Sequence, residues 1–258
     1  MDPGLHSPLI DFFRRGEVAR DVRLLAAQGA LAPRAHEQLA LLILLSDDAD
    51  PVIATNANAT LDALPAAALQ SFLARTDVPA QMRQFFAARG VVGAGQAATD
   101  AGPLLDTSDG PDESKTPDGA DDEPADAQLL SALPIIERMK LAMKGTRAQR
   151  AQLVRDSNKL VAAAVLSSPK LTEIEVEAFA KMANVGEEVL RTIAMNRTWT
   201  KNYGVIAGLA KNPKTPPALS MNLLQRLNDR DLKMLAIDRN VPEGVRLAAR
   251  RMTAKNIK

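Results

Sequence analysis

Apolar residues recur at intervals of three and four along most of the chain, the spacing that places them on one face of an α-helix. No segment alternates apolar and polar residues over the length of a strand, and the pattern therefore predicts an all-α fold. In the first ninety residues it predicts short helices within residues 17–28, 34–46, 51–64, 66–75 and 79–89. After residue 127 it predicts helices within residues 133–145, 147–156, 159–168, 172–183, 186–196, 200–212, 216–228, 230–239 and 242–252.

Between the two helical segments, the stretch from Gly90 to Ala127 is rich in Gly, Pro, Asp and Ser. Such a composition buries too little apolar surface to offset the entropy lost on ordering. We therefore expect an N-terminal helical-repeat domain at residues 1–90, a disordered acidic linker at 91–127 and a C-terminal helical-repeat domain at 128–258.

The C-terminal segments contain an internal repeat. RDSNKLVAAAV from Arg155, RTWTKNYGVIA from Arg197 and RNVPEGVRLAA from Arg239 align, with starts 42 residues apart both times. A second pair, from Ser168 and Asn212, is 44 residues apart, which we interpret as a two-residue loop insertion. A period near 42 residues is the size of a HEAT or armadillo unit. The repeat therefore predicts an α-solenoid, in which each unit covers a hydrophobic face of its neighbour.

The run RDSNKLVAAAVLSSPKLTEIEVEAFAKMANVGEEVLRTIAMNRTWTKNYG, continued by KNPKTP and NDRDLKMLAIDRNVPE, resembles an uncharacterised family of bacterial HEAT-like repeat proteins. The resemblance covers Arg147 to Arg251 and is looser over the first ninety residues. It implies an α-solenoid in a bacterial cytoplasmic protein. It brings no activity and no functional residues with it.

The net charge of +1 hides an asymmetry along the chain. Residues 1–99 carry 8 basic and 10 acidic side chains, a net charge of −2. Residues 100–126 carry 1 and 10, a net charge of −9, whereas residues 127–258 carry 23 and 11, a net charge of +12. An acidic linker thus precedes a basic domain.

The composition argues against several kinds of chemistry. Cysteine is absent, which excludes disulfides and thiolate chemistry. Of the two histidines, His6 lies in the terminal segment and His36 stands beside Glu37, where we expect a helix-surface position rather than a metal ligand. The acidic pairs Glu187-Glu188 and Asp229/Asp231 begin predicted helices, where carboxylates interact favourably with the helix dipole. We therefore expect no enzyme activity, no metal and no cofactor.

Two further patterns concern ligands and membranes. The run from Gly93 to Ala98 formally matches a dinucleotide fingerprint, but it lacks the required strand before it and helix after it. The longest apolar run, LALLILL at 39–45, is too short to cross a bilayer. The first residues do not resemble a signal peptide. We expect a soluble cytoplasmic protein.

The only tryptophan and the only tyrosine, Trp199 and Tyr203, are four residues apart and would share one face of a helix. In the 42-residue alignment, position 199 corresponds to Val241 and Ser157, and position 203 to valines in both sister repeats. The preferred interpretation is that both are large residues at packing positions. The alternative is a stacking platform for a ligand, suggested by their cationic neighbours.

Arg155, Arg197 and Arg239 recur once per repeat, each at the end of a predicted helix and before the next. The residues that follow them are all of helix-capping types, namely Asp156, Thr198 and Asn240. The arginines are expected either to bond carbonyls at the helix ends or to form a basic ladder that faces an acidic partner. Lysines extend this ladder at Lys159, Lys170, Lys201, Lys211 and Lys214.

We interpret the chain as a non-catalytic scaffold that binds an acidic protein partner through this basic repeat surface. The linker, residues 100–126, is a candidate for masking that surface from within the chain. The alternative function is nucleic-acid binding, in which the basic stack contacts phosphates. Membrane-surface binding lacks a basic amphipathic helix with large apolar anchors. A HEAT-like DNA-repair enzyme would need a catalytic acid in an aromatic-lined cleft.

Overall fold

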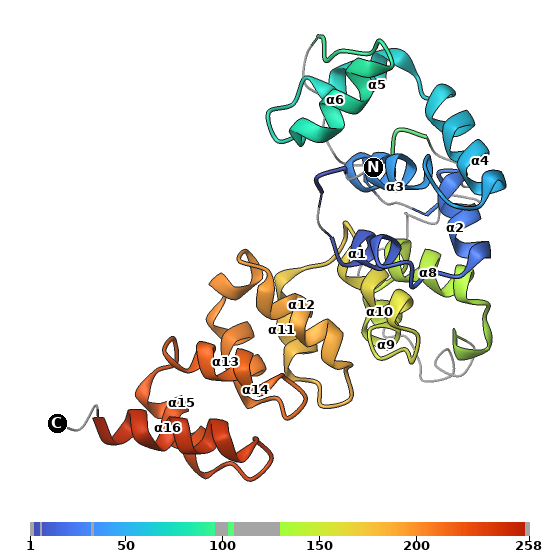
Figure 1. The fold of residues 1–258 in the computed structure, drawn as a ribbon. Helices are drawn as coiled ribbons and strands as arrows, with labels where there is room; N and C mark the ends of the chain where they lie inside the picture. The colour runs from blue at the N-terminus through green and yellow to red at the C-terminus, as the bar shows by residue number, and fades with distance from the viewer. Residues whose placement is uncertain (1–2, 6, 32–33, 96–102, 106–129, 256–258) are drawn as a thin grey trace. The chain divides into compact units, whose positions relative to one another are not determined.

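The computed structural model describes residues 3–5, 7–31, 34–95, 103–105 and 130–255, and all its regular elements in these ranges are helices (Figure 1). The predicted all-α fold is confirmed. The chain divides into two compact units. Unit 1 comprises residues 1–144 and 167–169, and unit 2 comprises residues 145–166 and 170–258. The helix at 135–144, which the expected boundary at 128 assigns to the C-terminal domain, thus groups with unit 1.

Unit 1 is built around one helix that is buried on all sides. Its helices are α1 (Pro8–Arg14), α2 (Arg20–Ala27), α3 (Ala35–Leu45), α4 (Pro51–Asp62), α5 (Ala66–Leu73), α6 (Ala80–Ala88) and α8 (Ile135–Lys144). Helix α3 contacts α1, α2, α4 and α6, and only Leu44 among its residues is not buried. The apolar run LALLILL is therefore the central helix of the unit 1 core.

The amino-terminal helix α1 was not predicted from the pattern. Its first turn is capped by Ser7, whose Oγ accepts a hydrogen bond from the N–H of Ile10 at 3.3 Å, and Pro8 stands at the first helical position. Leu9 and Ile10 are fully buried. A helix of seven residues shows too few turns for its periodicity to be recognised. His6, which precedes this helix, lies outside the described residues.

The expectation of a helix-surface histidine at position 36 is wrong. His36 is only 8% exposed, and its ring meets the edge of Phe72 with ring centroids 4.6 Å apart. Glu37 and Gln38, which follow it, are buried as well. Because α3 is covered on all sides, even its polar first turn lies inside the protein.

The segment that follows α6 packs against unit 1, contrary to the expectation of a disordered linker from residue 91 onward. The N–H of Ala94 donates to the carbonyl of Gln70 at 3.1 Å. A Cβ added to Gly93 would lie 2.6 Å from the carbonyl carbon of Leu73, so only glycine fits here. The glycine of the apparent dinucleotide fingerprint therefore permits a close approach to α5. Residues 96–102 and 106–129 lie outside the described ranges.

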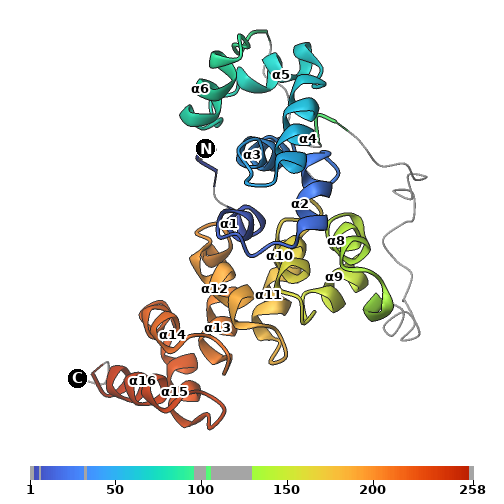
Figure 2. The same ribbon diagram turned by 45° about the vertical axis from the view of Figure 1, so that its right-hand side comes forward.

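Unit 2 contains the repeated segments. Its helices are α9 (Arg147–Leu153), α10 (Lys159–Leu166), α11 (Glu173–Lys181), α12 (Glu187–Met195), the short 3-10 helix η1 (Trp199–Lys201), α13 (Tyr203–Lys211), α14 (Pro217–Leu224), α15 (Asp229–Ile237) and α16 (Glu243–Lys255). Every α-helix in this unit overlaps a predicted segment, although α15 begins one residue before its segment and α16 continues three residues beyond its segment. Figure 2 shows α9 to α16 following one another in chain order along the unit. The closest helix pairs are α15 with α16 and α11 with α13.

The helices of unit 2 recur in a fixed order, but their spacing is not a constant 42 residues. Helices α10, α13 and α16 begin at residues 159, 203 and 243, so that the intervals are 44 and 40. Helices α11 and α14 begin 44 residues apart, at residues 173 and 217. The loop between α9 and α10 spans residues 154–158, whereas the loop between α12 and α13 spans 196–202 and contains η1. The inserted pair of residues therefore lies before α13.

A close contact joins α11 to α13, which belong to successive repeats. A Cβ on Gly208 would lie 3.2 Å from the Cβ of Ala180, so glycine allows the two helices to approach. At the end of α13, the buried Asn212 donates from Nδ2 to the carbonyls of Ala180 and Met182 at 2.9 and 3.0 Å. These contacts satisfy carbonyls at the end of α11, which have no partner within their own helix.

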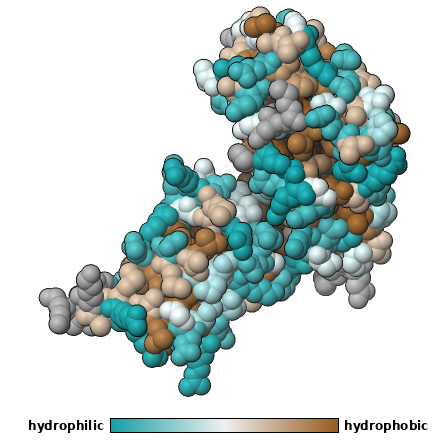
Figure 3. All heavy atoms as spheres, in the orientation of Figure 1, coloured by the Kyte–Doolittle hydropathy of each residue, from teal (hydrophilic) through white to brown (hydrophobic). Residues whose placement is uncertain are grey.

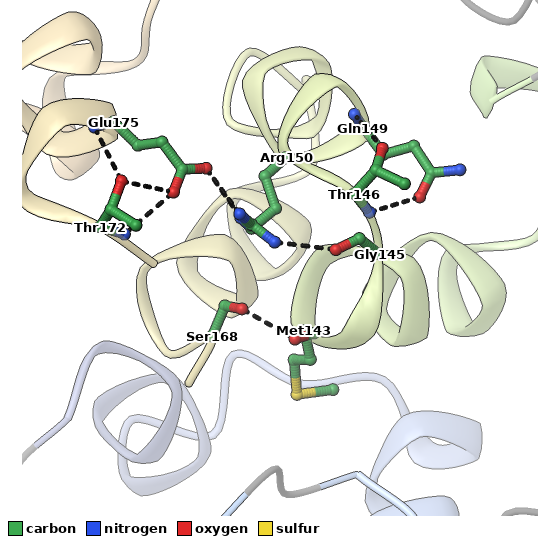
Figure 4. Close-up of polar contacts among 8 residues, drawn as sticks. All are labelled: Met143, Gly145, Thr146, Gln149, Arg150, Ser168, Thr172 and Glu175. Atoms are coloured by element: carbon green, nitrogen blue, oxygen red, sulfur yellow. Dashed lines mark hydrogen bonds and ion pairs between the residues drawn. The ribbon is translucent and has the colours of Figure 1, made fainter. Parts of the chain in front are cut away.

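A buried ion pair joins α9 to α11 inside unit 2 (Figure 4). Arg150 donates to Oε1 of Glu175 from Nε at 2.9 Å and pairs with it through a terminal guanidinium nitrogen at 2.8 Å. Its other terminal nitrogen donates to the carbonyl of Gly145 at 2.8 Å. Glu175 Oε2 accepts from the N–H and the hydroxyl of Thr172, both at 2.9 Å, which completes a capping box at the start of α11. One carboxylate thus caps its own helix and holds the preceding one.

Candidate partner-binding surface

The three recurring arginines occupy equivalent positions in unit 2. Arg155, Arg197 and Arg239 directly follow the C-cap residues of α9, α12 and α15, and all three are exposed. They therefore lie at the corners between α9 and α10, between α12 and α13, and between α15 and α16. We call Arg155, Lys159, Arg197, Lys201 and Arg239 the corner cations.

The contacts of these arginines differ between repeats. Arg155 donates from Nε to the carbonyl of Ala151 at 2.9 Å, which is the helix-end contact expected for a structural role. Within residues 130–255, neither Arg197 nor Arg239 makes a side-chain hydrogen bond or an ion pair. The first arginine thus caps its own helix, while the other two direct their charge to the solvent.

Two of the residues of capping type that follow the arginines, Asp156 and Thr198, do not cap the next α-helix. Asn158, rather than Asp156, bonds the first turn of α10, because its Oδ1 accepts from the N–H of Leu160 at 2.9 Å. Asn202, rather than Thr198, caps α13 by accepting from the N–H of Gly204 at 2.8 Å. The two cap positions are 44 residues apart, as are the helices they begin.

Trp199 and Tyr203 do not share one helix face, and the prediction that they do is wrong. Trp199 lies in η1, Tyr203 begins α13, and Asn202 between them has an extended backbone with φ −72° and ψ 122°. The two-residue insertion also shifts the alignment, so that Val205, which is fully buried, corresponds to the buried valines of α10 and α16. Tyr203 corresponds to Lys159 instead and is 40% exposed. It is not a large residue at a core position.

Tyr203 and Lys211 meet at Asp231, on the first turn of α15. Lys211 Nζ lies 2.6 Å from Asp231 Oδ1, and the Tyr203 hydroxyl donates to Oδ2 of the same carboxylate. The N–H of Asn228 donates to the Tyr203 hydroxyl at 3.2 Å. The hydrogen bonds from Lys211 and Tyr203 lower the pKa of Asp231 below its usual value. Burial and the bond to Asp231 raise the pKa of Tyr203.

This cluster has two consequences for the predicted site. A phenol with a raised pKa stays protonated at neutral pH, so Tyr203 is not activated as a nucleophile. The charge of Lys211 is balanced by Asp231 at close range, so Lys211 contributes little to a basic surface. Asp231 is also in the position expected from the sequence, at the start of a helix, where its N–H donates to Asn228 Oδ1 at 2.7 Å.

The predicted basic ladder separates into two sets. The corner cations precede or begin α10, α13 and α16. Lys170 and Lys214 instead follow the ends of α10 and α13, in the loops before α11 and α14. Helix α10 has 8 residues, and at about 1.5 Å per residue it separates the two sets by roughly 12 Å. Asn212 fixes the second of these loops by accepting from the N–H of Lys214 at 3.0 Å. Lys170 and Lys214 are both exposed.

Exposed apolar residues adjoin two of the arginine corners, a feature that the sequence analysis missed. Met195 and Ile237 are the last residues of α12 and α15, and they are 67% and 69% exposed. Each is two residues before an arginine, Arg197 or Arg239. On the face drawn in Figure 3, hydrophobic residues are interspersed among hydrophilic ones over this part of the chain. The signal available in the sequence was an apolar residue at the end of both helices.

The expected contact between the acidic linker and the basic domain falls mostly on residues 106–126, outside the described ranges, and stays a prediction. Among the described residues, no three His, Asp or Glu side chains are grouped as metal ligands would be. No helix in the described ranges has the length and apolar character needed to span a membrane. Comparison with protein-family models, with curated proteins and with solved structures found no match to this chain.

Proposed function

We propose that the chain is a non-catalytic helical-repeat scaffold that binds an acidic protein partner through the corner cations of unit 2. The observation that carries this proposal is the repeated pair of an exposed apolar residue and an unpaired arginine, Met195 with Arg197 and Ile237 with Arg239. The recurring order of helices in unit 2 supports an α-solenoid of HEAT-like repeats, in which such corners form a row.

A protein partner fits these corners better than nucleic acid does. Arginine and methionine are both enriched at the cores of protein interfaces, where an apolar contact and a charged contact are made together. Phosphate contacts need cations but gain nothing from an exposed Met195 or Ile237. Tyr203, the most exposed aromatic residue of unit 2, is bonded to the carboxylate of Asp231, which would repel a phosphate backbone near a stacked base.

The experiment compares two charge reversals in the full chain. The variant with Arg197→Glu and Arg239→Glu is expected to lose binding of the protein partner that the unaltered chain captures, because the charge of both solvent-directed arginines is inverted. The matched control, Lys170→Glu with Lys214→Glu, makes the same change in charge on the other set and is expected to retain that partner. Far-UV circular dichroism verifies that both variants stay folded.

Two results would contradict the proposal. One is retention of the partner by the arginine variant together with its loss by the lysine variant. The other is binding of random duplex or single-stranded nucleic acid that weakens steeply with salt and is lost in the arginine variant, since that is the behaviour of phosphate contacts.

A further inference from the structure

Gln38, on the first turns of α3, binds the only other described part of the linker. Its Oε1 accepts hydrogen bonds from the N–H of Leu104 at 2.7 Å and of Leu105 at 3.1 Å. Its Nε2 donates to the carbonyl of Leu105 at 2.8 Å and to the carbonyl of Gly29 at 3.0 Å. The amide therefore pairs with both backbone groups of Leu105. Its oxygen accepts from two successive N–H groups, which the bent backbone at Leu104 and Leu105 directs to the same side.

These four hydrogen bonds use the full capacity of a glutamine side chain, two acceptor positions and two donor hydrogens. With the segment in place, Gln38 is only 1% exposed. A buried amide that loses its partners is strongly disfavoured. All four bonds of Gln38 are made to backbone groups, and three of them are made to Leu104 and Leu105.

The surroundings hold the Gln38 amide in this orientation. Gly29 ends α2 with a left-handed φ of +80°, and a Cβ there would lie 3.4 Å from Gln38 Nε2. Cγ2 of Thr60 on α4 lies 3.4 Å from the same Cβ position, and the Thr60 hydroxyl donates to the carbonyl of Ala27 at 2.7 Å. Because Nε2 must face the Gly29 carbonyl, Oε1 is directed at the peptide. The receptor is therefore built from three helices of unit 1.

The bound segment is distinctive within the linker. Leu104 and Leu105 are the only large apolar residues between residues 96 and 127. Both leucines are half-buried, as is Pro103 before them. Backbone bonds to Gln38 hold the bent segment, and the partial burial of both leucines favours this sequence over the polar residues around it.

We propose that Gln38, oriented by the Gly29 carbonyl, forms a peptide-binding site for a bent Leu-Leu segment, and that the chain's own Pro103–Leu105 is its resident ligand. When this segment is prevented from binding, the site takes the same peptide supplied as a separate molecule. The site lies in unit 1, and it does not depend on the corner cations or on their partner.

The test uses a vacated full chain and a labelled peptide. Leu104→Pro with Leu105→Pro removes both N–H donors to Gln38 and keeps the rest of the chain. A fluorescein-labelled peptide of residues 101–108, AGPLLDTS, is titrated with each protein and its anisotropy followed. Tethering gives the resident segment an effective concentration in the millimolar range. The intact chain is therefore expected to bind the peptide at least about 10-fold more weakly than the vacated chain.

Two controls separate recognition by Gln38 from non-specific binding. The peptide AGPPPDTS, without the two donors, is expected to bind the vacated chain at least about 10-fold more weakly. Adding Gln38→Met to the vacated chain is expected to weaken binding of AGPLLDTS by the same factor. Equal affinity of the intact and vacated chains, or no binding of the peptide to the vacated chain, overturns the proposal.

A measurement on the unaltered chain makes the test independent of how the variants fold. Hydrogen exchange is expected to show protection of the Leu104 and Leu105 amides. Gln38→Glu is expected to reduce it, because a carboxylate has no N–H to donate to the carbonyls of Leu105 and Gly29. Exchange of both amides at the rate of an unstructured peptide in the unaltered chain overturns the proposal.

Discussion

Removal of the Arg150 guanidinium is expected to destabilise unit 2 strongly. Arg150 and Glu175 side chains are 6% and 2% exposed, and the guanidinium supplies both contacts to Glu175 Oε1, at 2.8 and 2.9 Å. In Arg150→Met the carboxylate keeps its bonds from Thr172 but has no opposite charge near it. Breaking a buried pair in this way costs about 3–5 kcal/mol. This is a large part of the roughly 5–15 kcal/mol by which a typical domain is stable.

The assay can follow unit 2 separately from unit 1. Trp199 is the only tryptophan and lies in unit 2, so its fluorescence reports on the unfolding of that unit in urea. With a urea dependence of about 2 kcal/mol per molar, a loss of about 4 kcal/mol lowers the midpoint by about 2 M. Arg147→Met is the control, because Arg147 is exposed on the same helix and its replacement is expected to change stability by less than about 0.5 kcal/mol.

A second substitution tests whether the unpaired charge is the cause. Glu175→Gln removes the charge, and glutamine at this position still supports the capping box of Thr172. The double variant Arg150→Met with Glu175→Gln is therefore expected to be more stable than Arg150→Met alone. The reasoning is refuted if Arg150→Met unfolds at the same urea concentration as Arg147→Met, or if the double variant is the less stable of the two.

Two further predictions concern local contacts. The pKa of Tyr203 is raised in the folded chain, so its contribution to folding stability is complete below pH about 10 and is lost as the pH rises through the folded pKa. In urea unfolding, Tyr203→Phe is therefore expected to lose less stability at alkaline pH than the unaltered chain. Identical pH profiles of stability for the two proteins would contradict this. Gly93→Ala places a Cβ against the backbone of Leu73 and is expected to destabilise unit 1 by about 1–3 kcal/mol and expose the Ala94 amide to exchange. Gly186→Ala, where a Cβ meets nothing within 4 Å, is the control, and unchanged exchange at Ala94 would contradict the packing argument.

The helices and the arginine corners could be predicted from the sequence because their signals are local and repeated. Helices such as α10 and α13 follow from apolar spacing, and the corner positions of Arg155, Arg197 and Arg239 follow from their recurrence after a helix. The environment of Tyr203 was predicted wrongly because the repeats were aligned without a gap at the two-residue insertion, which paired Tyr203 with buried valines. The 44-residue interval between Ser168 and Asn212 was the available signal that an insertion lies between Arg197 and Asn212.

Contacts between distant residues could not be predicted in this way. The capping box from Thr172 to Glu175 can be read from four neighbouring residues, but the arginine that meets it lies 25 positions earlier. Gln38 stands between the polar first turn of α3 and its apolar run, and nothing nearby in the sequence shows which backbone it binds. The leucine pair within the acidic linker was the one indication that this stretch contains a segment that becomes buried.

The distance in sequence between Gln38 and its peptide has a consequence during synthesis. The residue that completes the Gln38 hydrogen bonds, Leu105, is made 67 residues later. At about 5–20 residues per second the ribosome needs roughly 3–13 seconds to reach it. During this interval α3 can pack against its neighbouring helices while a polar group in their core still lacks its partners. Until Leu105 has been made, the Gly29 carbonyl is the only one of the partners of Gln38 that exists, so the proposed peptide site is unoccupied during this interval.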